Sequence, residues 1–298
     1  GNSIFRDWFQ KKNFTLPDYI PSLNALVDEP DFFNILLMGR QGTNVDTMIF
    51  ANINSSTRKI TLVSVPRDLY VKGRKINSVY ADYGVTEQVK WVEEILGYKI
   101  HKFALIDMFA FEDIVNLMGG VDVTLEQDLI DPTYKVCEGD VCSTLYYEAG
   151  DYHLDGTASL RVARSRYTTS DYDRAARQQL ILDAMKNKAQ SLGLGDANAV
   201  LKIISRAVTA TETNITVDEA LRYYFRYQNF DLAHGAVLST GNVLKTVKEP
   251  VNFLTSLVVE QCLDPANPDT CSETYAIYTL RPLDDNWDAI HWFVSNQL

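Results

Sequence analysis

Residues 32–39, FFNILLMG, are a short, continuous apolar run that ends at a glycine. A run of this length is typical of a strand that is buried on both faces of a sheet. Two further strand-like runs follow, TMIFANIN at 47–54 and KITLVSVP at 59–66, and polar, turn-forming residues separate them. We therefore expect these three segments to begin a central sheet.

Helical and extended patterns alternate after these runs. The chain reads in turn as a helix over 87–97, a strand over 99–108, a helix over 110–120 and a strand over 121–126. This alternation predicts an α/β fold, in which a largely parallel or mixed sheet is covered by helices on both faces. Further along, we expect helices at about 172–191 and at 217–228, and a late strand at 274–282.

Size and composition limit the function. The 298 residues include 46% hydrophobic and 22% charged residues, as in ordinary globular proteins. The net charge of −11 argues against a nucleic-acid partner, which would require an extended basic face. No run of about 18 apolar residues occurs, so no segment of the sequence is predicted to cross a membrane.

The N-terminal residues 1–30 are irregular and contain prolines, so we predict an N-terminal arm or linker there and one domain over 31–298. Gly1, Asn2 and Ser3 resemble the remnant of a cleaved expression tag. We therefore expect a soluble ectodomain whose N-terminal membrane anchor is missing.

Four cysteines form two local pairs, Cys137 with Cys142 and Cys262 with Cys271, each within a polar stretch. Their spacings lack the paired C-x2-C knuckles and the partnering histidines of a structural zinc site. Two short disulfide loops in an oxidising compartment fit the pattern better, with four free thiols as the alternative. Disulfides would imply secretion.

An unusual concentration of arginine lies between Leu160 and Gln179, in a chain that is acidic overall. The arginines are Arg161, Arg164, Arg166, Arg174 and Arg177. Guanidinium groups match phosphate oxygens two at a time, so this cluster predicts a phosphate or pyrophosphate site. A solvated helix face, with the arginines paired to nearby acids, is the alternative.

The periodicity of the helix expected at 172–191 favours the phosphate site. Its apolar stripe includes Ile181 and Met185, and stepping back along the stripe reaches Gln178, Arg177 and then Arg174. These side chains belong to the first turns of the helix, where backbone N–H groups and the helix dipole favour an anion. The sequence therefore predicts a preformed phosphate pocket.

Seven motifs stand in a fixed order between Asn34 and Gln179. They are NILLMG (34–39), VDTMIFANIN (45–54), KITLVSVPRDLYV (59–71), KINSVYADYG (75–84), LMGGVDVTL (117–125), YHLDGTASLRVARSR (152–166) and SDYDRAARQQ (170–179). Together they resemble the LytR-CpsA-Psr (LCP) family, and the resemblance covers the chain from about Asp31 to the C-terminus.

The resemblance implies a membrane-anchored phosphotransferase at the extracytoplasmic face of a bacterial cell membrane. Such an enzyme moves a glycopolymer phosphate from a polyprenyl-pyrophosphate carrier to a cell-wall acceptor such as peptidoglycan. The implied fold is a central mixed β-sheet flanked by helices on both faces, and it holds the lipid tail between the sheet and the helices. The helices that carry Trp91, Ile95, Phe109, Phe111 and Val115 would either close a core or leave a slot for isoprenoid units.

Carried over residue by residue, the resemblance surrounds the pyrophosphate with side chains from three motifs. These side chains are Arg67, Arg164, Arg166, Arg174 and Gln178. Asp46 matches the family's metal-binding acid and would hold Mg²⁺. The resemblance gives catalytic roles to Asp46, Arg67, Arg164 and Arg166.

Two positions depart from the pattern of the family. Most members have an acid soon after the glycine of the first strand and an arginine two residues before the metal-binding aspartate, whereas this chain has Gln41 and Asn44. Arg40 is expected to supply the missing positive charge, and Arg177 is a further candidate for pyrophosphate binding. The second ligand of Mg²⁺ stays open.

The implied reaction is attack of a sugar hydroxyl on a phosphorus atom of the pyrophosphate, with release of polyprenyl phosphate. Arginines and a metal ion would neutralise charge on the phosphate oxygens, and Asp46 could alternatively activate the hydroxyl. Two other functions stay open: a polyprenyl-pyrophosphate hydrolase, and a non-catalytic module that binds polyprenyl phosphate or an anionic glycan. The sequence has neither a G-x-x-x-x-G-K-[ST] loop nor a G-x-S-x-G elbow, which disfavours nucleotide enzymes and serine hydrolases.

Overall fold

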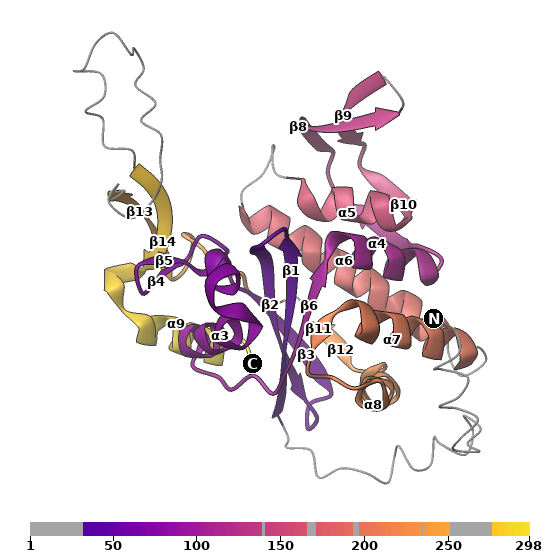
Figure 1. Ribbon diagram of the computed structural model, residues 1–298, viewed down its shortest axis with the longest axis horizontal. Helices are drawn as coiled ribbons and strands as arrows, with labels where there is room; N and C mark the ends of the chain where they lie inside the picture. Colours follow the sequence, from indigo (N-terminus) through magenta and orange to yellow (C-terminus); the bar gives the residue numbers. More distant parts are fainter. Residues whose placement is uncertain (1–31, 139–140, 166–170, 193–196, 234, 251–275) are drawn as a thin grey trace.

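The computed structural model describes residues 32–138, 141–165, 171–192, 197–233, 235–250 and 276–298. The expected N-terminal arm, Arg166 and the pair Cys262 and Cys271 lie outside these residues. The described chain is arranged around one central sheet, which Figure 1 shows nearly edge-on.

The central sheet contains six strands in the order β11–β6–β1–β2–β3–β12. Their bounds are β1 (Phe32–Gln41), β2 (Asn44–Asn54), β3 (Lys59–Ser64), β6 (Lys102–Asp107), β11 (Glu212–Thr213) and β12 (Asp231–Ala233). β1 runs antiparallel to β2 and parallel to β6, while β3 pairs antiparallel with β2 and parallel with β12. The sheet is therefore mixed, as predicted.

Successive residues of β1 point to opposite faces of the sheet, and both faces are covered. Leu36 and Met38 belong to the larger core cluster, whereas Ile35 and Leu37 pack on the other face. Two helices contribute to the larger cluster, α3 (Val79–Leu96) and α9 (Trp287–Ser295). Both lie on the same side of the sheet in Figure 1.

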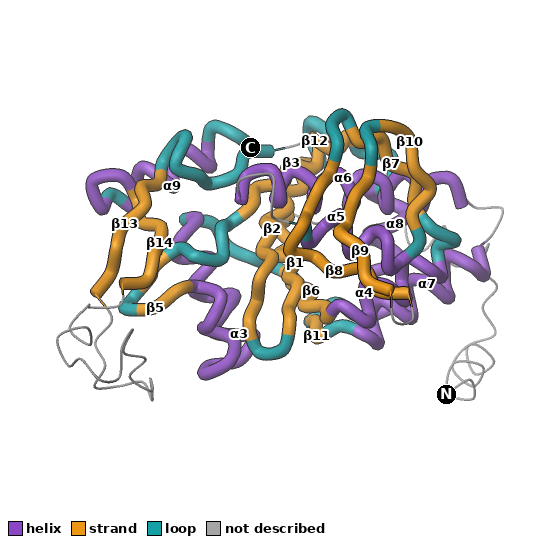
Figure 2. The backbone as a smooth tube through the Cα atoms, turned by 90° about the horizontal axis from the view of Figure 1, so that it is seen from above, coloured by secondary structure: helices purple, strands orange, loops and turns teal. Residues whose placement is uncertain are grey.

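The remaining helices lie on the opposite side of the sheet (Figures 1 and 2). They are α4 (Met108–Leu117), α5 (Gly156–Arg164), α6 (Asp171–Leu192), α7 (Ala197–Ala210) and α8 (Val217–Tyr227). Leu182 of α6 packs against Ile49, Ala51 and Leu62 of the sheet. Helices thus flank both faces, and the predicted α/β architecture is confirmed.

Two predicted strands lie outside the central sheet. β7 (Val121–Leu125) forms a two-stranded sheet with β10 (Gly150–Leu154), and β14 (Ala276–Pro282) forms another with β13 (Leu244–Pro250). Buried and exposed residues alternate along β7. Alternation of this kind belongs to a strand with one solvated face, whereas β2 and β3 of the central sheet are buried over most of their length, which fits the peripheral position of β7.

Helix α3 is longer than the predicted segment 87–97. Gly84, with φ of 78° and ψ of 178°, interrupts the helix near its start. The side chain of Gln88 is fully buried and accepts a hydrogen bond from Tyr80 N at 3.0 Å, which satisfies a backbone group beside this kink. Because a kink breaks the helical period, the pattern at 87–97 did not reveal the preceding turns.

The smaller elements include two hairpins, one of which carries a disulfide. Their strands are β4 (Tyr70–Val71), β5 (Arg74–Lys75), β8 (Leu129–Glu138) and β9 (Val141–Tyr147). Cys137 and Cys142 face each other across β8 and β9 and form a disulfide with an S–S distance of 2.01 Å. The first predicted cysteine pair is therefore confirmed. Within the described residues, no helix is both long and apolar enough to cross a bilayer.

We expect Gly156→Ala to destabilise the contact between α4 and α5. A Cβ atom at Gly156 would lie 2.2 Å from the carbonyl oxygen of Glu112, so the two helices would have to separate. The expected loss in free energy of unfolding is about 1–3 kcal/mol, measured by denaturant titration. The matched control is Gly241→Ala, because a Cβ atom there meets only Ser239 Oγ, at 3.5 Å. Equal stabilities of the two variants would contradict this expectation.

The start of α8 is stabilised by a capping box. Thr216 Oγ1 accepts a hydrogen bond from Glu219 N, and Glu219 Oε2 accepts one from Thr216 N. Glu219 Oε1 also accepts a hydrogen bond from Lys102 Nζ at 2.7 Å. Burial acts to raise the pKa of Glu219, but the hydrogen bonds from Lys102 and Thr216 prevail, and the pKa is lowered.

A lowered pKa in the folded state means that Glu219 stabilises the protein above its unfolded pKa and that this stabilisation is lost as pH falls. Glu219→Gln should therefore unfold at a lower temperature than wild type near neutral pH. The difference between the two unfolding temperatures should shrink as the pH falls below 4.5, the ordinary pKa of a glutamate side chain. Thermal unfolding followed by circular dichroism across this range measures it, and a pH-independent difference would refute the expectation.

Candidate functional site

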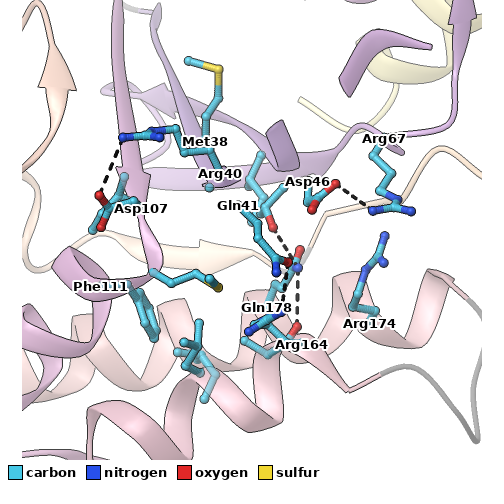
Figure 3. Close-up of a pocket in the computed structure, with 18 of the residues that line it drawn as sticks. Met38, Arg40, Gln41, Asp46, Arg67, Asp107, Phe111, Arg164, Arg174 and Gln178 are labelled. Carbon is cyan, nitrogen blue, oxygen red and sulfur yellow. Dashed lines mark hydrogen bonds and ion pairs between the residues drawn. The ribbon is translucent and has the colours of Figure 1, made fainter. Parts of the chain in front are cut away.

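A cavity of about 400 Å³ lies between one end of the central sheet and helices α4, α5 and α6 (Figure 3). Its apolar wall is formed mainly by Leu37, Ile49, Ile106, Phe111, Leu160, Ile181 and Leu182. Its polar wall carries Gln41, Asp46, Arg67, Arg164, Arg174 and Gln178. A cavity with this division suits a ligand that has an apolar tail and an anionic head.

The antiparallel pairing of β2 with β3 brings Asp46 and Arg67 together. Asp46 lies near the start of β2, and Arg67 follows Pro66 just beyond the end of β3. Because the strands run in opposite directions, these two positions lie at the same end of the strand pair. Arg67 Nη1 donates a hydrogen bond to Asp46 Oδ1 at 2.7 Å (Figure 3). The predicted metal ligand and the predicted pyrophosphate ligand are therefore in direct contact.

A second acid supports Arg67 from the side away from Asp46. Arg67 Nε lies 3.5 Å from Asp68 Oδ2, and Lys75 Nζ donates to Asp68 Oδ1 at 2.6 Å. The four side chains form a row of alternating charge, and each retains partial exposure. Because the row holds the Arg67 guanidinium in place, an entering anion would meet a donor group whose position is already fixed.

Helices α5 and α6 supply the other polar side chains. Arg164, the last residue of α5, donates from Nη2 to Gln41 Oε1 at 2.9 Å. Gln178 Nε2 donates to Thr47 Oγ1 at 2.9 Å. Arg174, in the first turn of α6, is 7% exposed and approaches Arg67 from the opposite wall in Figure 3. The structure thus brings together Asp46, Arg67, Arg164, Arg174 and Gln178, as predicted from the sequence.

Arg40 lines the same cavity but is directed away from Arg67. Its Nη1 donates to Gly42 O at 2.9 Å, and its Nη2 lies 3.6 Å from Asp107 Oδ2 (Figure 3). Asp107 also caps α4 by accepting a hydrogen bond from Ala110 N. The structure therefore does not place Arg40 with the other arginines, and sequence analysis missed the acid that holds it.

Arg177 joins two helices instead of lining the cavity. Its Nε donates to Val162 O at 3.2 Å and its Nη2 donates to Ser165 O, both at the C-terminal end of α5. Burial lowers the pKa of Arg177, and the carboxylates of Asp173 and Asp131 oppose that shift. An arginine stays protonated at physiological pH, so Arg177 adds a permanent positive charge to the junction of α5 and α6.

The hairpin of β8 and β9 adds a part of the cavity wall that sequence analysis did not find. Its register shifts between Asp131 and Lys135, and Thr133 and Tyr134 line the cavity. The Asp131 carboxylate is 2% exposed and accepts hydrogen bonds from Thr133 N, Thr133 Oγ1 and Tyr134 N. The guanidinium of Arg164 lies 5.8 Å from the centre of the Tyr134 ring. The turn-forming sequence Asp-Pro-Thr at 131–133 was the available signal.

The apolar residues considered for a lipid slot fall into different environments. Phe111 lines the cavity, whereas Trp91 and Ile95 belong to the core cluster beneath α3. Val115 is buried in a separate cluster, and Phe109 is 81% exposed. A slot therefore exists beside Phe111 but not at the other four positions.

The oxygen donors of the cavity fit Mg²⁺ only as an ion shared with a phosphorylated ligand. In the parts of the chain that the structure describes, no three His, Cys, Asp or Glu side chains gather as a metal site. Three carboxylates line the cavity, but Asp107 pairs with Arg40 and caps α4, and Asp131 accepts hydrogen bonds within its own turn. Asp46 lies next to Thr47 at the polar wall and is the carboxylate that would bind the ion. Mg²⁺ is often held by one or two carboxylates together with water and substrate phosphates, so one carboxylate is sufficient in that setting.

The chain is similar to a family of known proteins and to relatives within it. The LytR_cpsA_psr family model matches residues 10–240. TagV of Bacillus subtilis (strain 168), a polyisoprenyl-teichoic acid–peptidoglycan teichoic acid transferase, is 29% identical over 215 residues, which are 66% of this chain and 54% of TagV. A TagU of the same description from Oceanobacillus iheyensis is 31% identical over 223 residues, with 68% and 65% covered. The chain spans between about half and two thirds of the length of these relatives.

The crystal structure of Bacillus subtilis TagV resembles this structure in fold. The two share a TM-score of 0.65 at 23% identity, and the match covers 91% of this chain and 98% of that one. At this level of identity the likeness supports the architecture described above.

We expect inorganic pyrophosphate to bind in the cavity, and Arg174→Met to weaken its binding by about tenfold or more, because a charge-assisted hydrogen bond is lost. Isothermal titration calorimetry measures both affinities. The matched control is Arg206→Met, because Arg206 pairs with Asp113 on α4 and does not line this cavity. Equal affinities of the two variants would show that Arg174 does not contact the anion.

Proposed function

The chain belongs to the LytR-CpsA-Psr family, and from this premise we propose that it transfers a glycopolymer phosphate from a polyprenyl-pyrophosphate carrier to a cell-wall acceptor such as peptidoglycan. One observation carries the proposal: within a single cavity, an apolar slot runs into a cluster of arginines beside Asp46. A prenyl chain that ends in a pyrophosphate is likewise apolar along its tail and anionic at its head. The relatives named as teichoic acid transferases support the same reaction.

The donor would bind with its tail in the slot and its head at the arginines. Leu37, Phe111 and Leu182 lie along the apolar wall, and each buried methylene group of the tail would contribute about 0.8 kcal/mol. Arg67, Arg164 and Arg174 would pair with the pyrophosphate oxygens, and Arg166 is a further candidate from the same motif. Gln178, fixed on Thr47, would orient the head group.

The proposed chemical step is a direct phosphoryl transfer. The acceptor hydroxyl oxygen forms a bond to the phosphorus that carries the glycan, and the bond from that phosphorus to the bridging oxygen breaks. The electron pair leaves with polyprenyl phosphate, and the proton of the hydroxyl passes to water. The guanidinium groups are placed to neutralise the charge that develops on the oxygens, which is the main contribution a protein makes to such a step.

Asp46 would hold Mg²⁺ when the ion arrives with the donor. The ion would supply charge neutralisation at the pyrophosphate oxygens. Asp46 is engaged by Arg67 in the structure described here, at 2.7 Å. This ion pair would hold both side chains in position until the donor binds.

We place the reaction at the outer face of a bacterial cell membrane. The tail of a polyprenyl carrier lies in the bilayer, and the acceptor belongs to the cell wall. The disulfide between Cys137 and Cys142 supports this location, because disulfides persist in oxidising compartments outside the cytoplasm.

We expect wild type to move the glycan phosphate of a prenyl-pyrophosphate-linked oligosaccharide onto peptidoglycan fragments. Asp46→Asn should lower kcat by about a hundredfold or more, because it removes the charge that holds the cation and positions Arg67. Product analysis by mass spectrometry, with and without acceptor, measures this.

Asp122→Asn is the control for this experiment, since the Asp122 side chain is 77% exposed and lies on β7. Release of free glycan phosphate at the same rate with and without acceptor would identify a hydrolase instead. Tight donor binding without turnover by wild type would identify a binding module.

A further inference from the structure

A second cavity, of about 540 Å³, shares one wall with the first. The shared residues are Asp46, Thr47, Arg67, Arg174 and Gln178. Asp46 and Thr47 belong to the start of β2, whose neighbours in the sheet are β1 on one side and β3 on the other. The rest of the first cavity comes from β1, β6, the β8–β9 hairpin and helices α4, α5 and α6, and the rest of the second comes mainly from the end of β3 and the loop after β12. The two cavities therefore flank the same cluster of charged side chains.

The second cavity differs from the first in chemistry. The polar side chains that it does not share are Ser64, Ser239, Thr240, Asn242 and Thr246, and all of them are uncharged. Hydroxyl and amide groups can donate and accept hydrogen bonds, as the hydroxyl groups of a sugar require. Apolar side chains also line this cavity, Met48, Val65, Val237, Leu238 and Leu280 among them, but none of its described lining residues is an isoleucine or an aromatic residue. A neutral saccharide fits this wall better than a prenyl chain does.

The loop that forms this wall is held in one conformation. Asn242 Oδ1 accepts hydrogen bonds from Ser239 N at 2.9 Å and from Val243 N at 2.7 Å, and Asn242 Nδ2 donates to Val237 O at 2.8 Å. Leu238 N also donates to Ser64 O at 3.1 Å, which fastens the loop to the end of β3. A preorganised wall costs little conformational entropy when a ligand binds.

We propose that the second cavity binds the acceptor, a neutral saccharide whose hydroxyl group attacks the phosphorus held between Arg67 and Arg174. The inference rests on the proposed function and adds the place of the second substrate. In-line displacement requires the attacking oxygen to lie opposite the leaving oxygen. Polyprenyl phosphate leaves into the first cavity, so the attacking hydroxyl enters from the second.

The glycan of the donor has the same chemistry as the acceptor, but it fits this cavity less well. It is attached to the reacting phosphorus through an oxygen that is equatorial in the transition state. The second cavity lies across the shared cluster from the apolar slot, so it is the side from which an attacking hydroxyl group would approach, and only the acceptor supplies that group. The acceptor is therefore the occupant to which the geometry points.

Bulky substitutions in the second cavity test the proposal. Thr240 and Thr246 are both exposed, so Thr240→Trp and Thr246→Trp should fold and should fill part of the cavity. We expect each to raise the KM for peptidoglycan fragments by about tenfold or more, as loss of a subsite does. The affinity for a bare prenyl pyrophosphate, measured by calorimetry, should stay within about twofold of wild type.

Thr57→Trp is the matched control, because Thr57 is an exposed residue in the turn between β2 and β3, at the other end of the sheet. An unchanged KM for the acceptor in both tryptophan variants would overturn the proposal. Weaker binding of a glycan-bearing donor, with the acceptor KM unchanged, would assign the cavity to the donor glycan and would overturn it as well. Absence of transfer by wild type would instead refute the proposed function, and the acceptor assignment with it.

Discussion

The antiparallel pairing of β2 with β3 is the constraint on which the site depends. It sets the start of one strand beside the end of the other. Asp46 and Arg67, 21 residues apart in sequence, therefore form an ion pair at one end of the sheet. The C-terminal end of α5 and the first turn of α6 meet at this end of the sheet and add Arg164 and Arg174. The guanidinium groups of Arg67, Arg164 and Arg174 therefore line one cavity, where an anion with several oxygens could accept hydrogen bonds from more than one of them.

The central sheet could be predicted because its strands carry a signal that is local in sequence. The segments 32–39, 47–54 and 59–66 are predominantly apolar and do not alternate strictly, since both of their faces are covered. The pairing partners of the outer strands could not be predicted, because contacts between distant parts of the chain decide them. The segment 121–126 reads as a strand in isolation, and nothing local shows that it pairs with β10 instead of the central sheet.

The same distinction divides the candidate site. Asp46, Arg67, Arg164, Arg174 and Gln178 lie within short motifs, so their residue types and spacing indicated a shared role before their contacts were known. Arg40 and Arg177 were grouped with them by charge and periodicity, but the acceptors that hold them belong to other elements. Tyr134 and the loop at 237–243 reach the site only through tertiary packing, which sequence patterns do not report.

The contacts of Arg177 have a consequence for selectivity. By fastening the last turn of α5 to α6, this side chain fixes the spacing between Arg164 and Arg174 through the backbone and leaves little of it to flexible loops. Two guanidinium groups with a fixed spacing favour a ligand whose oxygens lie at a matching separation. The preference of the site for its anion therefore depends on how two helices pack, and not only on the side chains that face the cavity.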